Sequence, residues 1–528
     1  MLDSLRRRLA DRAPDRQLQA LASGAPAAAT LSLTLDLGPG GSDWLAAVPA
    51  GAPFWYQAQP AHDEYRLALG HALQVTSTGP HRFAALDNAF AGIAGAWRHN
   101  APPVAFCGFA FDEQAAAPLP NALLTIPALV LETRDGRCRA ILSTPADKIS
   151  VASAGWQMLL AKPAPAAALR LLPAGDQTLA DRAWLARVRA ALRDIAGGRV
   201  DKLVLARSRH LAAAAPVAPG SLLAALLGQQ PEAMIYACSN GHDTFLGATP
   251  ERLVRLAGRQ LTADALAGTA WPGSPELAAP KNRHEQALVA RAIVAALTRH
   301  CVDVPQAGPL EVHAAGHLSH LRTQISGTTA PGVTIFDLLG ALHPTPAVGG
   351  FPVAAATSWL AAHGEARHGW YSGGFGTLGA DGTGEFHVAL RSALISGRHI
   401  ELQAGAGIVA GSDPELELAD PEWFGICIAT PDGHVYEVGD CSQPFTIQSV
   451  SKPLTYGLAL EQHGEDTVLE KIGVEPSGDA FNAISLHPLS GTPLNPLINA
   501  GAIAACSLIA GDSVDEKTAA ILETFSRY

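Results

Sequence analysis

Long apolar runs, paired cysteines and an excess of basic residues are all missing from this chain of 528 residues. No eighteen consecutive residues are apolar, and the first twelve lack the apolar core of a signal peptide, which disfavours a membrane partner and favours the cytoplasm. The seven cysteines are scattered without a Cys-x-x-Cys pair, so neither a disulfide framework nor a zinc site is indicated. A net charge of −11 provides no basic surface for nucleic acid. Oligomeric state is left open.

What the chain does have is 48% apolar residues, enough for large cores, and a length typical of two to four domains. Charge is unevenly distributed along it. Residues 421–528 hold 14 Asp and Glu against 4 Lys and Arg, whereas residues 1–420 hold 34 against 33. This break predicts a domain boundary at residue 420.

Two apolar runs with strand-like composition, Val200 to His210 and Leu246 to Leu256, contain the first candidate catalytic residues. One carries Lys202, and the other carries Glu251 directly after Pro250. Among buried aliphatic residues a lysine can serve as a neutral base and a carboxyl as a protonated acid. The alternative is a solvated lysine and glutamate at strand ends.

Three further carboxylates are candidates for a metal site. A helix expected from about Pro280 to Cys301 places Glu285 on its apolar face, where an anion needs a metal or a cationic side chain as partner. A glutamate that only stabilises the helix start is the alternative. A second helix expected after Ser412 carries Glu417 and Asp420 three residues apart on one face, and such oxygen ligands suit Mg²⁺.

Two more residues suggest contacts with a ligand. Arg391 lies in the strand-like run Glu385 to Ile395, where its planar guanidinium suits a carboxylate, although a salt bridge at a strand edge is equally open. Gly268, in the segment DALAGT, allows close approach of the backbone to a ligand, or simply a turn.

In their order along the chain, several segments resemble those of the chorismate-utilising enzymes, and among these the isochorismate synthases. The resemblance covers most of residues 100–420 and is carried by DKLVLAR, GATPERL, DALAGT, KNRHEQALV, HLRT, LHPTPAVGGFP, GWYSG, EFHVALRSALI and AGAGIVAGSDPE. It implies an α/β fold in which two β-sheets are sandwiched between helices, with Mg²⁺ and chorismate bound at their junction.

The resemblance also implies roles for individual residues. Lys202 matches the base that activates water for attack on ring C2, where relatives that use ammonia carry a Gln, and Glu251 matches the acid that assists loss of the C4 hydroxyl. The remaining residues implied for the pocket are Arg391, Tyr371 and the Gly405 backbone for the enolpyruvyl carboxylate, His320 on the ring side, and Gly268, Thr269, Ala347 and Val348 for the wall.

The implied metal ligands are Glu285 and Asp420, with Glu417 behind them. Here the sequence departs from the family pattern, because Asp420 stands where the family has Glu. A family lysine four residues further on is replaced by Phe424, after Pro421. The residue before a proline avoids the helical region, so the expected helix ends at about Asp420.

The last fifth of the chain has a different character. Ser449 and Lys452 form a Ser-x-x-Lys pattern, in which the lysine can take the serine proton for nucleophilic attack. The surrounding segments PFTIQSVSK, GVEPSGDAFNAISL and NPLINAGAI resemble serine-dependent glutaminases of β-lactamase-like fold. This resemblance implies that Ser449 is the nucleophile, Lys452 its base and Asn499 a ligand of L-glutamine. A glutaminase domain is normally about twice this length, so residues 421–528 are expected to be part of one.

Three hypotheses follow. The first is a Mg²⁺-dependent isomerase in residues 1–420 that converts chorismate to isochorismate for menaquinone or siderophore synthesis. The second is a hydrolase that releases ammonia from glutamine, or an ammonia donor to an aminating chorismate enzyme. The third is an inactive fusion of both.

Overall fold

The structure is a computed structural model that describes the chain apart from residues 50, 115–117, 161–170, 174–176, 271–276, 278, 316–317, 366, 415–424, 430–434, 440–450, 475–485, 488–489 and 526–528. The chain divides into two compact units, Met1–Glu422 and Trp423–Tyr528. Among the described residues, no helix is both long and apolar enough to cross a bilayer.

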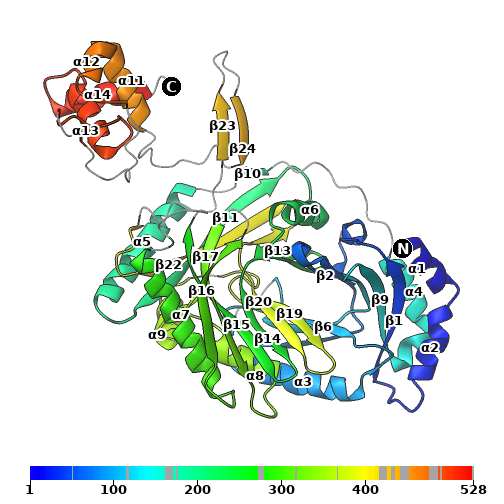
Figure 1. Ribbon diagram of the computed structural model, residues 1–528. Coiled ribbons are helices and arrows are strands. Elements are labelled where there is room, and N and C mark those ends of the chain that lie inside the picture. The colour runs from blue at the N-terminus through cyan, green and yellow to red at the C-terminus, as the bar shows by residue number, and fades with distance from the viewer. Residues whose placement is uncertain are drawn as a thin grey trace. The chain divides into compact units, whose positions relative to one another are not determined.

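Unit 1 is built on two large β-sheets (Figure 1). The first sheet has thirteen strands in the described part of the chain, which are β1 Thr30–Pro39, β2 Pro53–Gln59, β3 Glu64–Leu69, β5 Arg98–His99, β8 Leu129–Arg134, β9 Arg137–Pro145, β10 Leu171–Pro173, β11 Lys202–Ala213, β12 Met234–Asn240, β13 Asp243–Thr249, β18 Gly350–Phe351, β21 Ser392–Ser396 and β22 His399–Val409. Its order is β10-β11-β22-β21-β13-β12-β2-β3-β8-β9-β1-β5, with β18 also paired to β11.

The second sheet has nine strands within the same described residues, namely β4 Leu73–Ser77, β6 Val104–Phe109, β7 Ala122–Ile126, β14 Arg252–Ala257, β15 Gln260–Ala270, β16 Gln306–Ala315, β17 Leu318–Thr328, β19 Gly374–Gly379 and β20 Gly384–Val388. Its order is β16-β17-β15-β14-β20-β19-β6-β7-β4. Nearly all pairs in both sheets are antiparallel; β1 and β5 run parallel.

Helices cover the outer faces of both sheets (Figure 1). Their bounds are α1 Leu2–Ala10, α2 Ala13–Leu21, α3 Arg82–Ala96, α4 Ile149–Leu159, α5 Gln177–Ala196, α6 Pro219–Gln229, α7 Pro280–Thr298, α8 Ile335–Leu342 and α9 Val353–Ala362. Buried residues of α1, α2, α4 and α6 pack on the first sheet, and those of α3, α7 and α8 on the second. The helices α5 and α9 pack against β11 and β22.

The two sheets face each other across an aromatic core. Tyr236 of β12 stacks on Phe375 of β19 with ring centroids 4.0 Å apart, and Trp55 of β2 lies 5.7 Å from Phe106 of β6. Each such pair contributes about 0.5–1.5 kcal/mol beyond the area it buries. The expected fold class, two sheets sandwiched between helices, is therefore confirmed.

At two of the places where the described chain crosses between the sheets, the structure corrects the sequence analysis. The run Leu246 to Leu256 is not one strand, since β13 belongs to the first sheet and β14 to the second, with Glu251 between them. Pro250 lacks the N–H needed to continue a ladder. The run Glu385 to Ile395 is likewise split into β20 and β21, with Arg391 between them. Both side chains are thereby placed at the junction of the sheets.

Unit 2 contains a hairpin and four helices in its described part. These elements are β23 Gly425–Ala429, β24 Val435–Gly439, α11 Ser451–His463, α12 Glu465–Leu469, α13 Asn499–Leu508 and α14 Val514–Phe525. The strands β23 and β24 pair in antiparallel orientation. A small core joins α11, α12, α13 and α14.

Candidate active site

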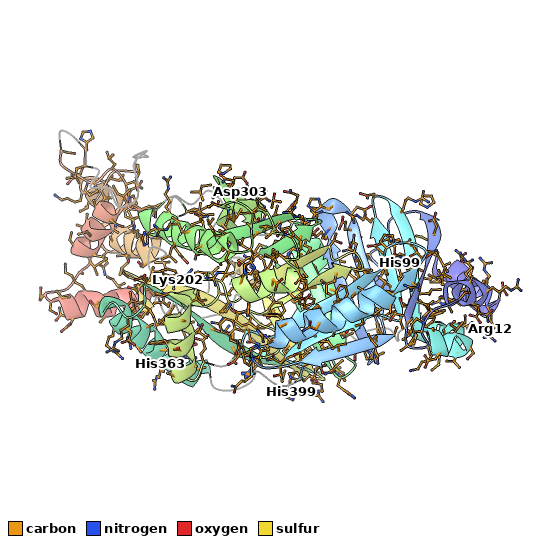
Figure 2. The ribbon with its side chains drawn as sticks, turned by 90° about the horizontal axis from the view of Figure 1, so that it is seen from below. Arg12, His99, Lys202, Asp303, His363 and His399 are labelled. Carbon is orange, nitrogen blue, oxygen red and sulfur yellow. The ribbon has the colours of Figure 1, made fainter. Side chains whose placement is uncertain are left out.

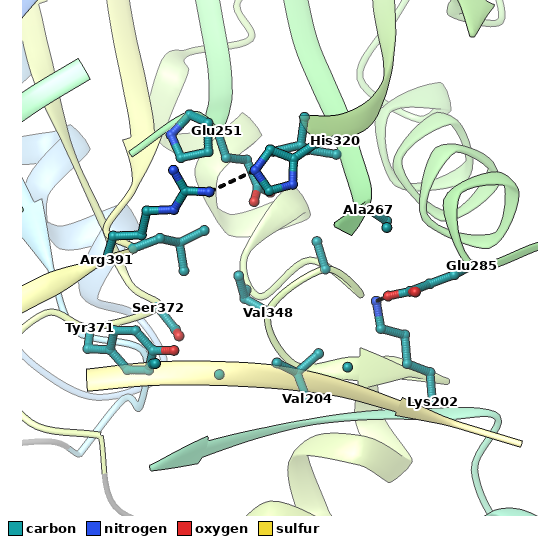
Figure 3. A pocket seen from close by; sticks show the side chains of 18 residues that line it. Lys202, Val204, Glu251, Ala267, Glu285, His320, Val348, Tyr371, Ser372 and Arg391 are labelled. Atoms are coloured by element: carbon teal, nitrogen blue, oxygen red, sulfur yellow. Dashed lines mark hydrogen bonds and ion pairs between the residues drawn. The ribbon is translucent and has the colours of Figure 1, made fainter. Parts of the chain in front are cut away.

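A cavity of about 180 Å³ lies where the two sheets of unit 1 meet (Figure 3). The residues that line it are Lys202, Val204, Pro250, Glu251, Leu266, Ala267, Gly268, Glu285, His320, Ala347, Val348, Tyr371, Ser372, Leu390, Arg391, Ala404, Gly405 and Gly407. Ten of the residues singled out from the sequence therefore line one cavity. An eleventh, Thr269, pairs with His320 in the β15–β17 ladder.

Lys202 begins β11 and is 1% exposed, inside unit 1 (Figure 2). Its Nζ lies 2.6 Å from Oε1 of Glu285, which reaches the cavity from α7. Of the two partners expected for the Glu285 anion, the structure thus shows a cation. Gly407 on β22 leaves room for this pair, because an added Cβ would lie 2.9 Å from Glu285 Oε1 and 3.2 Å from Lys202 Cε.

Glu251 faces the same cavity from another side (Figure 3). The residue is 3% exposed, and its Oε1 has no hydrogen-bond partner among the described residues. Burial raises the pKa of the Glu251 carboxyl to about 8; Lys202 opposes the rise, and Asp264 adds to it. At neutral pH this carboxyl is therefore protonated and can donate a proton. The alternative of a solvated lysine and glutamate is wrong, because both side chains are buried.

Arg391 supplies a cation at the same end of the cavity as Glu251 (Figure 3). Its Nη2 donates to Nε2 of His320 at 2.8 Å. Burial, together with the charge of Arg391, lowers the pKa of His320 to about 3, so the imidazole is neutral and can accept this bond. A rigid guanidinium held in this way is suited to an anionic group of a ligand.

The backbone that presents Arg391 is conformationally unusual. Arg391 has φ of +50°, in the left-handed region that non-glycine residues rarely adopt. Two neighbours hold it there. The hydroxyl of Tyr236 donates to Leu390 O at 2.9 Å, and Gly247 allows close approach, since an added Cβ would lie 2.5 Å from Arg391 O.

Tyr371 closes the cavity above β22. Its hydroxyl lies so near Gly405 that an added Cβ there would be 2.7 Å from the oxygen, and a side chain at this position would have to displace it. Sequence reasoning missed Val204 and Ser372 in the wall. The sequence could have indicated Val204, because residues two apart in a strand point to the same face and Val204 comes two residues after Lys202. Ser372 follows Tyr371 with φ of +58°, and no pattern indicated that conformation.

The predicted metal site is only partly described. Glu285 lies in the cavity wall, whereas Glu417 and Asp420 lie outside the described residues. Within the described part of the chain, no group of three or more His, Cys, Asp or Glu is arranged to hold a metal. Mg²⁺ commonly binds through one or two carboxylates together with substrate oxygens and water. The carboxylate of Glu285, whose side chain is 11% exposed, fits that mode of binding.

Unit 2 has its own candidate site. Lys452 on α11 is 8% exposed, and its Nζ donates to Asn499 Oδ1 at 2.7 Å and to Leu497 O at 3.0 Å. The predicted nucleophile Ser449 lies outside the described residues. Two of the three residues expected for a glutaminase site are thus in contact.

Comparison with known proteins agrees with the geometry of the cavity. Residues 30–423 match the family model described as "Chorismate binding enzyme". The chain belongs to the chorismate-binding enzymes. One relative in this family is the salicylate biosynthesis isochorismate synthase of Pseudomonas aeruginosa, 33% identical over 402 residues that cover 70% of this chain and 82% of the relative. The solved menaquinone-specific isochorismate synthase of Escherichia coli superposes with a TM-score of 0.64 at 28% identity, covering 76% of this chain and 94% of that one.

The C-terminal part of this chorismate-binding enzyme matches a second family. Residues 407–528 match the family model described as "Glutaminase". The glutaminase of Microcystis aeruginosa is 51% identical over 131 residues, which cover 25% of this chain and 38% of the relative. The chain therefore spans under two fifths of the length of the glutaminases that it matches.

Proposed function

We propose that residues 1–420 form a cytoplasmic domain that converts chorismate to isochorismate, for menaquinone or siderophore synthesis. The observation that carries this proposal is the placement of Lys202 and Glu251. Both are buried in the walls of one cavity, and the pKa of Glu251 keeps its carboxyl protonated at neutral pH. A base and an acid on separate sides of a bound ring are what addition and loss of water require.

The proposed reaction balances as an isomerisation. A water oxygen bonds to ring C2, the ring double bonds shift, and the bond from C4 to its hydroxyl breaks. Lys202 takes a proton from the attacking water, and Glu251 gives a proton to the departing hydroxyl, which leaves as water. Glu285 orients the Lys202 amine from 2.6 Å.

The charged groups of chorismate are assigned to other parts of the cavity. Arg391, Tyr371 and the Gly405 backbone hold the enolpyruvyl carboxylate, and His320 keeps the Arg391 guanidinium in place. When bound, Mg²⁺ would neutralise the ring carboxylate. Glu285 would hold the ion, together with Glu417 and Asp420. Gly268, Ala347 and Val348 line the wall around the ring, and Thr269 is assigned to the same wall on the resemblance.

The test is product analysis of the purified full chain incubated with chorismate, with and without Mg²⁺. Isochorismate should form in the presence of Mg²⁺ and be lost in Lys202→Met. The matched control is Lys148→Met, which changes an exposed lysine remote from the cavity. Unchanged turnover in Lys202→Met would remove Lys202 as the base, and salicylate as the product would indicate a lyase.

A second candidate function is glutamine hydrolysis by residues 421–528, because Lys452 contacts Asn499 in unit 2. The chain spans 38% of the glutaminase relative. The assay is glutamate release from L-glutamine by the wild type and by Ser449→Ala. Substantial release that depends on Ser449 would establish the hydrolase, and an amino-chorismate product formed from glutamine would indicate ammonia transfer.

A further inference from the structure

The strand that carries Lys202 has an incompletely paired edge close to the cavity. On this edge β11 pairs with β18 at Lys202 and Leu203, and with β10 at residues 211–213. Between those two ladders, the described part of the chain provides no strand partner for Val204 to His210 on that side. Unpaired backbone groups in a buried position are costly, so another partner is needed.

A buried ion pair satisfies two backbone groups of that edge. Arg367 Nη2 donates to Val204 O at 2.7 Å, and Glu365 Oε1 accepts from Ala206 N at 3.1 Å. The two side chains also bind each other, with Arg367 Nε 2.9 Å from Glu365 Oε1. Their side-chain exposures are 3% for Arg367 and 1% for Glu365. The pair therefore takes the place of a neighbouring strand.

The same arginine also reaches the loop that precedes β18, a loop that already adjoins β11 through the bond from Val204 N to Gly349 O at 3.1 Å. Arg367 Nη1 donates to Val348 O at 2.6 Å, and its guanidinium carbon lies 3.9 Å from the centre of the Phe111 ring. Val204 and Val348 both line the cavity, whereas Glu365 and Arg367 do not. One planar group thus joins the strand of the proposed base to the loop that forms another part of the wall.

Stability alone is a poor explanation for this pair. Desolvation of two charges offsets their attraction, and replacing a buried ion pair by apolar residues is often neutral or stabilising. Its distinctive effect is geometric, because a guanidinium directs several donors along fixed directions. Lys202 lies two residues from Val204, so a shift of the strand moves the amine as well. A misplacement of about 1 Å can cost about 100-fold in rate.

We infer that Glu365 and Arg367 are positioning residues that reinforce the contact between β11 and the loop containing Val348, and with it the placement of Lys202 over the substrate ring. This inference rests on the proposed isochorismate synthase function. Neither Glu365 nor Arg367 contacts the substrate in this arrangement. Loss of the pair should therefore affect turnover more than substrate binding.

The test compares Arg367→Met, Arg367→Lys and Glu365→Gln with the wild-type full chain. Arg66→Met is the matched control, because Arg66 forms an ion pair with the buried Glu132 in the same sheet, away from the cavity. For Arg367→Met we expect kcat to fall by about 10- to 100-fold with KM changed by less than about threefold. Arg367→Lys should be intermediate, since a single ammonium cannot reproduce the fork. The control should keep wild-type kcat.

Amide hydrogen exchange provides a readout that does not depend on turnover. Peptides containing Val204 to Ala206 and residues 344–349 should exchange faster in Arg367→Met than in the wild type, and equally fast in Arg66→Met and the wild type. Unchanged exchange in those peptides would overturn the inference, as would wild-type kcat in Arg367→Met or an equal loss of kcat in the control. If the wild type forms no isochorismate, the proposed function fails and the exchange experiment still decides the positioning role. If Arg367→Met does not fold, Glu365→Gln and Arg367→Lys are judged by the same two criteria.

Discussion

Replacing Glu251 by glutamine should stabilise the protein and inactivate it at the same time. Glutamine has nearly the shape of the protonated carboxyl but cannot ionise. Since Glu251 is buried and its Oε1 has no hydrogen-bond partner among the described residues, the substitution removes no bond at that atom. The proton proposed for the departing hydroxyl is lost, so kcat should fall by about 100- to 10,000-fold.

The gain in stability follows from the pKa. Burial raises the Glu251 pKa from 4.5 to about 8, and at about 1.4 kcal/mol per pKa unit this corresponds to up to about 5 kcal/mol. Below pH 4.5 the Glu251 carboxyl is protonated in both the folded and the unfolded chain. Its contribution to the free energy of unfolding is then fully present. Between pH 4.5 and about 8 the unfolded chain loses the proton while the folded protein keeps it. Stability of the wild type is therefore lost as pH rises through this window.

The assay is urea denaturation of both proteins at several values between pH 5 and pH 8.5, followed by tryptophan fluorescence. Eight of the nine tryptophans precede residue 423, so the signal reports mainly on unit 1. The stability difference between Glu251→Gln and the wild type should grow with pH and level off above about pH 8. A difference that does not change over this range would refute the reasoning.

Glu132→Gln provides a control of opposite sign. Burial raises the pKa of Glu132, but Arg66 and Arg139 outweigh that effect and leave the pKa lowered overall. Its stabilising contribution is present above the unfolded pKa and is lost as pH falls through the folded pKa. The Glu132→Gln variant should consequently be less stable than the wild type at pH 7, and the difference should shrink in acid.

Three further predictions concern the cavity. Gly405→Ala should lower kcat/KM for chorismate at least about tenfold in steady-state assays, because the new methyl would lie 2.7 Å from the Tyr371 hydroxyl; wild-type kinetics would contradict that contact. Glu285→Gln should weaken binding of Mg²⁺ by about tenfold or more in calorimetry with the metal alone, and an unchanged affinity would exclude Glu285 as a ligand. Arg391→Lys should raise KM by about tenfold while keeping the charge, since a lysine cannot reproduce the guanidinium held by His320; an unchanged KM would show that charge alone suffices.

The site was predictable from the sequence to a considerable extent, because its residues stand in short segments of distinctive composition. Lys202, Glu251 and Arg391 each lie within such a segment, and all three line one cavity. The helix carrying Glu285 was also expected close to where it is found. Local patterns predict local structure because period and capping act over a few residues.

The sheet crossings at Pro250 and Arg391 were not predicted. An apolar run that leaves one sheet and enters another has the same composition as one continuous strand, so periodicity cannot distinguish the two. Yet these crossings place Glu251 and Arg391 at the junction of the sheets.

By itself, then, the sequence determined the family of the chain, the order of its segments and the kinds of chemical group available to the site. The tertiary structure decided which groups meet. It brought Glu285 to Lys202, and it placed the Glu365 and Arg367 pair against the unpaired edge of β11. Such contacts join residues separated by many tens of positions, and they depend on how strands pair and helices pack. A pattern confined to a few neighbouring residues carries no information about them.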